Sequence, residues 1–120
     1  MSKVEALNST KQLLELLNEI DGIYEKVRVT KEEHDFKQVV EPYARKVEEL
    51  TKNWQRQLEE VIKEQQAYFI GERHIDQVVD NTSHLSIQAF YASTSYSRFK
   101  SYLQSTKFLL KTMERQLKEM

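Results

Sequence analysis

The strongest constraint on the fold is a hydrophobic repeat in the C-terminal quarter of the sequence. Buried-type side chains recur there at alternating steps of four and three residues: Phe99, Leu103, Thr106, Leu110, Met113, Leu117 and Met120. This spacing places all of them on one face of an α-helix that packs against other helices. Ser93, Thr94 and Ser95 precede the repeat and are residue types that cap helix N-termini. We predict a helix over about residues 95–119.

The N-terminal segment carries a second helical stripe, formed by Leu13, Leu17, Ile20, Tyr24 and Val27. Two capping-box spacings, Ser2 with Glu5 and Ser9 with Gln12, leave its start open. Gly22 weakens the predicted helix by roughly 1 kcal/mol relative to Ala, which a long amphipathic segment tolerates.

A third stripe crosses the only proline, Pro42, and consists of Phe36, Val40, Tyr43, Val47, Leu50, Trp54, Leu58 and Val61. Because proline disrupts a helix interior, we expect a kink or a fresh start near Pro42. The main helix is predicted over residues 42–68, residues 31–41 form a short helical entry, and Gly71 ends the helix in a left-handed cap.

The fourth stripe predicts a helix over residues 73–87 from Ile75, Val78, Val79, Thr82 and Leu85. Residues 88–92 fit no period and are predicted to form an ordered connection. With only two glycines and one proline, a strand-rich fold is disfavoured. The sequence therefore predicts an all-α, antiparallel up-down four-helix bundle, a single domain over residues 1–120. Residues 11–25 carry four acidic side chains and residues 93–120 six basic ones, which favours neighbouring positions for the first and last helices.

Charge and composition restrict the partners. Eighteen basic and nineteen acidic residues give a formal net charge of −1, so a nucleic-acid partner is disfavoured unless a local patch attracts it. No apolar run approaches the roughly 20 residues of a membrane span, so we expect no membrane partner. The absence of cysteine fits a reducing compartment, and we expect a cytoplasmic protein.

No pattern of catalytic or metal-binding residues is visible. None of the three histidines belongs to the Glu-x-x-His motif of di-iron bundles, and Asp80 with His84 supplies only two ligands. A Gly-x-Ser-x-Gly nucleophile turn is also missing. We predict a non-enzyme without metal or cofactor; the alternative is a bundle enzyme or metal-binding protein with an unrecognised site.

A basic stripe on the last predicted helix is formed by Lys100, Lys107, Lys111, Arg115 and Lys118. It is interrupted by acidic residues and has no interleaved aromatic platform. We interpret it as a solvated face, partly neutralised by the acidic first helix.

Five of the twelve aromatic residues lie within residues 90–102. Two interpretations stay open: the rings plug one end of the bundle, or exposed rings anchor a partner beside basic side chains. We predict that Phe90 and Phe99 belong to the core. We expect a protein partner, and a chain that is a monomer or weak homodimer, with a candidate interaction surface at Gln88, Tyr91, Tyr96, Arg98, Lys100 and Tyr102.

Several short motifs resemble the YppE-like family, an uncharacterised family of Gram-positive bacteria. They are Asp35-Phe36 before Pro42, the later Trp54, Ile87-Gln88-Ala89-Phe90-Tyr91, Arg98-Phe99-Lys100 and Tyr102-Leu103-Gln104-Ser105. The chain departs from the family pattern at Ala92-Ser93, where Pro-Lys often follows the Phe-Tyr pair. The resemblance implies a compact four-helix bundle in a bacterial cytoplasm and brings no catalytic residue, cofactor or partner.

Overall fold

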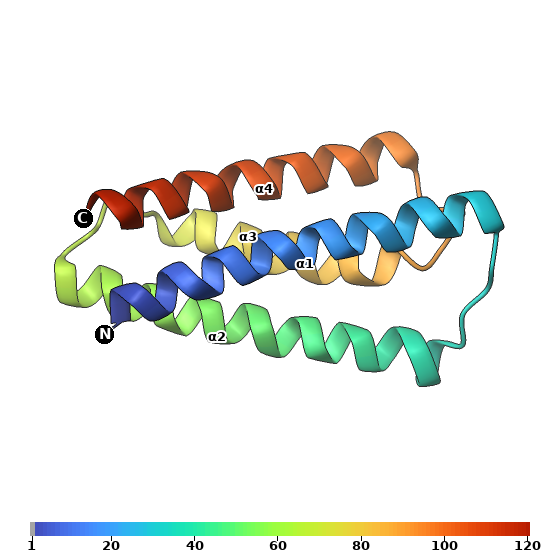
Figure 1. Cartoon of the computed structure of the whole chain (residues 1–120), viewed down its shortest axis with the longest axis horizontal. Helices are drawn as coiled ribbons and strands as arrows, with labels where there is room; N and C mark the ends of the chain where they lie inside the picture. The colour runs from blue at the N-terminus through green and yellow to red at the C-terminus, as the bar shows by residue number, and fades with distance from the viewer. Residues whose placement is uncertain (1) are drawn as a thin grey trace.

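The computed structural model describes residues 2–120, which fold into four long helices lying side by side (Figure 1). Successive helices alternate in direction, and residues 2–120 contain no strand. The α2–α3 connection therefore lies at the same end as both chain ends (Figure 1). The elements are α1 (Ser2–Thr30), one π-type turn η1 (Phe36–Val40), α2 (Glu41–Gln65), α3 (Glu72–Gln88) and α4 (Tyr96–Glu119). The predicted antiparallel up-down bundle is confirmed.

The core is built from the predicted stripes. Helix α1 packs between α2 and α4, and α3 packs between the same two helices on the other side. The repeat of α4 is buried from Phe99 to Leu117, and Trp54 and Tyr24 are the largest side chains with no exposed surface. Fully burying one such apolar side chain contributes about 1.5–3 kcal/mol, so these stripes supply the main stabilisation.

Each helix also places one threonine in the core with no exposed surface: Thr10, Thr51, Thr82 and Thr106. Three of the four hydroxyls donate to a backbone carbonyl three or four residues earlier in their own helix. The Thr82 hydroxyl has no hydrogen-bond partner within residues 2–120. These buried threonine hydroxyls therefore mostly satisfy their hydrogen bonding within their own helices.

The predicted neighbourhood of the acidic first helix and the basic last helix is confirmed by an ion-pair cluster. Lys100 Nζ on α4 donates to Asp21 Oδ1 and lies 3.1 Å from Glu25 Oε1, both on α1. Burial by itself lowers the pKa of Lys100, but the hydrogen bonds and negative charges of the two carboxylates outweigh it, and the net effect raises the pKa.

The entry into α2 differs in part from the prediction. The predicted irregularity near Pro42 is the change from the π-type turn to α-helix: η1 runs directly into α2, with Pro42 in the first turn of α2, and residues 31–35 are not helical. Only η1 is helical in the predicted entry, and Asp35 caps it by accepting a 2.8 Å hydrogen bond from Gln38 N. Because this π-type turn shifts the helical register, Phe36 is 47% exposed and the prediction that it joins the stripe is wrong.

The predicted left-handed cap at Gly71 is also wrong. The left-handed residue is Gln66, with φ 54° and ψ 40°, and its backbone N–H donates a hydrogen bond to Ile62 O. Gly71 has an extended backbone and precedes the first turn of α3. Helix α2 ends early because the following connection turns inward to bury Ala67 and Ile70 under the end of the bundle.

Candidate functional site

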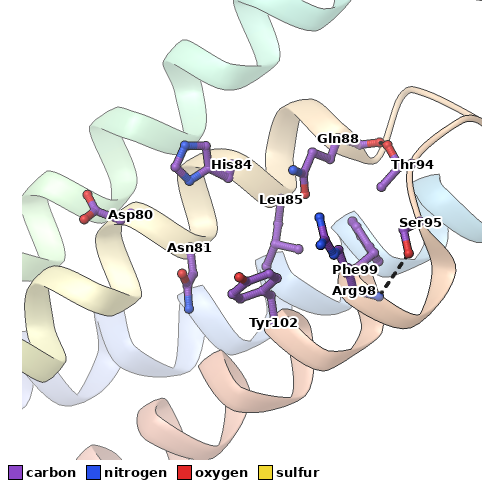
Figure 2. Close-up of a pocket in the computed structure, with 10 residues that line it drawn as sticks. All are labelled: Asp80, Asn81, His84, Leu85, Gln88, Thr94, Ser95, Arg98, Phe99 and Tyr102. Atoms are coloured by element: carbon purple, nitrogen blue, oxygen red, sulfur yellow. Dashed lines mark hydrogen bonds between the residues drawn. The ribbon is translucent and has the colours of Figure 1, made fainter.

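A groove of about 520 Å³ lies between α3 and the first turns of α4 (Figure 2). We call it the α3–α4 groove. Most of the residues that line it are polar, and the buried side chains of Leu85 and Phe99 form its apolar floor. The polar lining residues are Asp80, Asn81, His84, Gln88, Thr94, Ser95, Arg98 and Tyr102.

Helical spacing explains why these side chains converge. Asn81, Leu85 and Gln88 follow one another at steps of four and three on α3, and Arg98 and Tyr102 are four residues apart on α4. The Ser95 hydroxyl caps α4 by accepting a 3.4 Å hydrogen bond from Arg98 N (Figure 2). The cap fixes where α4 begins and so holds Arg98 at the mouth of the groove.

Arg98 is the only Lys or Arg side chain lining the α3–α4 groove, and it points toward Gln88 (Figure 2). Within residues 2–120, its guanidinium makes neither an ion pair nor a hydrogen bond to any side chain or carbonyl. Tyr102 places a half-exposed ring next to it, near Leu85. A fork of five donors beside an accessible ring is an arrangement that recognises carboxylates and flat apolar groups together.

The far end of the groove is fixed by hydrogen bonding between the two helices. Asn81 Nδ2 donates to Thr106 Oγ1 at 3.2 Å, and Thr106 Oγ1 donates to Tyr102 O. The first bond ties α3 to α4 at this end of the groove, and the second, within α4, orients the Thr106 hydroxyl that accepts it. The groove is therefore preformed, which lowers the entropy cost of filling it.

The predicted surface is divided among three places. Gln88, Arg98 and Tyr102 share the α3–α4 groove. Tyr91 lines a separate hollow of about 450 Å³ with residues 31–34, and it is 40% exposed. Tyr96 and Lys100 instead face α1.

The contacts toward α1 occupy two of the predicted side chains. The Arg28 guanidinium lies 4.1 Å from the centre of the Tyr96 ring, a cation–π distance. Lys100 is held by the two carboxylates of α1 described above. Both residues therefore already have partners inside the chain.

The aromatic cluster is divided between buried and exposed rings. Phe90 and Phe99 are buried, and Phe99 packs 4.1 Å from Tyr24 between ring centres. Phe90 meets the edges of His34 and Tyr43 at the end of the bundle. The tyrosines of the cluster are the rings that reach solvent.

The sequence interpretation missed an aromatic ring on the basic stripe. Phe108 is 60% exposed and lines a shallow hollow with Lys107, Lys111 and Arg115. The prediction that no aromatic platform interleaves the basic stripe is wrong in that this one ring is exposed among three of its cations. The signal was present, because Phe108 falls outside the alternating repeat of α4 and is therefore on its outer side.

Metal-ligating side chains do not assemble in the part of the chain that the structure describes. Residues 2–120 hold no cluster of three or more His, Asp or Glu side chains with the geometry of a metal site. Asp80 and His84 line the α3–α4 groove as a pair. None of the described helices is long and apolar enough to span a membrane.

The fold and groove define a small four-helix-bundle protein with a preformed polar cleft along one pair of helices. Residues 10–117 match the model of DUF1798, a bacterial domain of unknown function, and the chain belongs to this family. The resemblance to YppE-like proteins is thereby confirmed. No relative was found among curated proteins.

Solved structures share the fold. A protein of unknown function from Listeria innocua is 23% identical with a TM-score of 0.90, over 98% of this chain and 94% of that one. The crystal structure of YppE from Bacillus subtilis is 22% identical with a TM-score of 0.89, over 99% and 97%. A DUF1798 domain from Staphylococcus aureus is 20% identical with a TM-score of 0.79, over 94% and 96%.

Proposed function

We propose that the protein is a non-catalytic interaction module that binds a segment of a protein partner in the α3–α4 groove. The observation that carries the proposal is the Arg98 guanidinium, which lies at the groove without an ion pair among the described residues and next to the half-exposed ring of Tyr102. Arginine and tyrosine dominate protein-binding hot spots because they bury much area and keep their polar tips bonded.

The chemistry of the groove selects among occupants. In this proposal a carboxylate of the partner accepts hydrogen bonds from the Arg98 guanidinium. The side-chain amides of Asn81 and Gln88 form hydrogen bonds with the backbone of the partner segment. An apolar side chain of the partner covers Leu85 and Tyr102. The groove is lined from Asp80 to Gln88 on α3 and from the Ser95 cap to Tyr102 on α4, an extent that suits a continuous peptide segment.

Affinity capture tests the proposal. The wild type is used as bait in extracts of the bacterium that encodes the chain, beside the Arg98→Ala and Tyr102→Ala variants. At a true anchor each change costs about 2 kcal/mol or more of binding, roughly 30-fold in Kd, while folding is nearly unchanged. Tyr91→Ala tests whether the contact continues across the end of the bundle.

Two matched changes at the opposite end of the bundle serve as controls. Arg73→Ala removes an exposed arginine at the start of α3, and Tyr68→Ala removes a ring that is 73% exposed. Both controls are expected to retain the partner. Retention of every specific partner by Arg98→Ala and Tyr102→Ala at wild-type affinity would refute the proposal.

A further inference from the structure

The outer face of α4 indicates the chemical class of the partner. We propose that the partner segment is an acidic amphipathic helix that continues from the α3–α4 groove along α4, with its apolar side over Phe108 and its carboxylates on Lys107, Lys111 and Arg115. This inference rests on the proposed function and adds the charge, conformation and extent of the occupant.

Phe108 forms a ridge between two hollows. On one side lies the basic hollow of about 260 Å³, lined by Lys107, Lys111 and Arg115. On the other side an open hollow of about 450 Å³ is lined by Gln77 of α3, Gln104, Ser105 and Leu109. A ridge flanked by two grooves is the relief into which side chains of another helix interdigitate.

The cations beside this ridge lack partners inside the chain. Lys100 and Lys118, on the same helix, are paired with carboxylates. Within residues 2–120, no ion pair involves Lys107, Lys111 or Arg115. An opposing row of carboxylates on a partner would complement them.

The charge distribution along the sequence also favours an acidic partner. Residues 81–113 contain no Asp or Glu, whereas the other 87 residues contain all 19. This acid-free segment includes the end of α3, the α3–α4 connection and most of α4. A partner that enters at Arg98 therefore meets no negative side chain of α4 before Glu114.

The spacing of the cations favours a helix as the occupant. Lys107, Lys111 and Arg115 follow one another at four-residue steps, about 6 Å apart along α4, and carboxylates at four-residue steps on a second helix have the same spacing. A membrane surface is disfavoured because Phe108 is the single apolar residue among those that line the basic hollow. Single-stranded nucleic acid is disfavoured because it requires successive stacking platforms.

Selection from a random 20-residue peptide library on the immobilised full-length protein tests the inference. We expect enrichment of peptides rich in Asp and Glu, with apolar residues at helical spacing. The best peptide, labelled with fluorescein, is expected to gain helical circular dichroism on binding and to bind more weakly at 0.5 M than at 0.05 M salt. Failure to enrich acidic helical peptides overturns the inference.

Matched variants locate the bound peptide. Phe108→Ala and Lys111→Glu are each expected to raise its Kd about tenfold or more. Phe69→Ala is the control for the ring, because Phe69 is also 60% exposed but lies in the α2–α3 connection. Lys46→Glu is the control for charge, because Lys46 is an exposed α2 lysine that makes no ion pair within residues 2–120. Both controls are expected to bind as the wild type does.

The variants separate this inference from the proposed function. If Arg98→Ala weakens peptide binding and Phe108→Ala and Lys111→Glu do not, the groove is retained and the acidic helix along α4 is excluded. If none of the three variants matters, both proposals fail. Binding of a 20-nucleotide single strand or of anionic phospholipid vesicles that requires Phe108 and Lys111, without acidic-peptide binding, also overturns the inference.

Discussion

The indole Nε1 of Trp54 on α2 donates a 2.9 Å hydrogen bond to the hydroxyl of Thr10 on α1. Thr10 Oγ1 donates in turn to Ala6 O at 2.7 Å. Neither Trp54 nor Thr10 has any exposed surface, so water cannot replace either bond. This short relay lets the largest side chain of the core be buried without an unsatisfied polar group.

Replacing Thr10 by valine is therefore expected to destabilise the protein. The change preserves shape but leaves the buried indole N–H without an acceptor, at a cost of about 1–3 kcal/mol in the free energy of unfolding. Urea denaturation, monitored by the fluorescence of the single tryptophan, measures this change in the free energy of unfolding. Thr10→Ser keeps the hydroxyl and should lose less than Thr10→Val; the opposite order would contradict the role of the bond.

Thr82→Val should behave differently although its environment is equally buried. The Thr82 hydroxyl makes no hydrogen bond within the described chain, so its removal leaves no other group unsatisfied. We expect an unchanged or higher free energy of unfolding, because the desolvation cost of the hydroxyl disappears. A loss above about 1 kcal/mol would instead reveal a buried water that bonds this hydroxyl.

Stability is expected to fall at alkaline pH. Burial raises the pKa of Tyr24 and of Tyr43. The pKa of Tyr43 is raised further by the 2.6 Å hydrogen bond that its hydroxyl donates to Glu19. The carboxylates of α1 raise the pKa of Lys100. The folded state thus holds these protons more tightly than the unfolded chain. Their contribution is complete below about pH 10, where the unfolded groups begin to titrate, and is lost as the pH rises through the raised values.

Urea midpoints at pH 8 and about pH 11 measure this loss. Tyr43→Phe removes one of the three groups, so the difference between its two midpoints should be smaller than in the wild type. An equal difference in both proteins would show that Tyr43 does not contribute.

Gly22→Ala is expected to stabilise the protein by about 0.4–1 kcal/mol. Gly22 lies within α1, and an added Cβ would meet no atom within 4 Å. Alanine reduces the conformational freedom of the unfolded chain without a clash. A higher melting temperature checks the prediction, and Gly22→Val provides a comparison in which β-branching should remove part of the gain. A lower melting temperature for Gly22→Ala would contradict it.

The helices were predictable because their signals are local. The repeat from Phe99 to Leu117 predicted both the extent of α4 and its buried face, and the scarcity of glycine and proline disfavoured strand-rich folds. Pro42 likewise predicted a kink or a fresh helix start nearby, and the regular α-helix begins there, directly after the π-type turn, because the missing N–H is tolerated in a first turn. The failure at Gly71 has a different origin: the burial of Ala67 and Ile70, rather than glycine's backbone freedom, decides where α2 ends.

The candidate site was only partly predictable. Arg98 and Tyr102 share a face of α4 by helical spacing alone, and the sequence placed both in the candidate surface. The opposite wall of the groove belongs to α3, and no local pattern indicates which face of α3 would meet them. The sequence predicted that the acidic first helix would partly neutralise the basic stripe, but it did not indicate that Lys100 is the side chain that α1 pairs, nor that Arg28 covers Tyr96. Tyr96 and Lys100 were therefore included in the candidate surface.

The sequence by itself determined four amphipathic helices, most of the residues that each of them buries and the short connections that force them to alternate in direction. The hydrophobic pattern of a helix repeats with every turn of that helix, so it can be recognised in the sequence without knowing which helices pack against it. Only the tertiary structure decided that Thr10 meets Trp54, that Lys100 is paired while Arg98 is not, and that Phe108 stands between two hollows. Those relations depend on how helices distant in sequence are rotated and shifted against one another, which packing of the whole core sets.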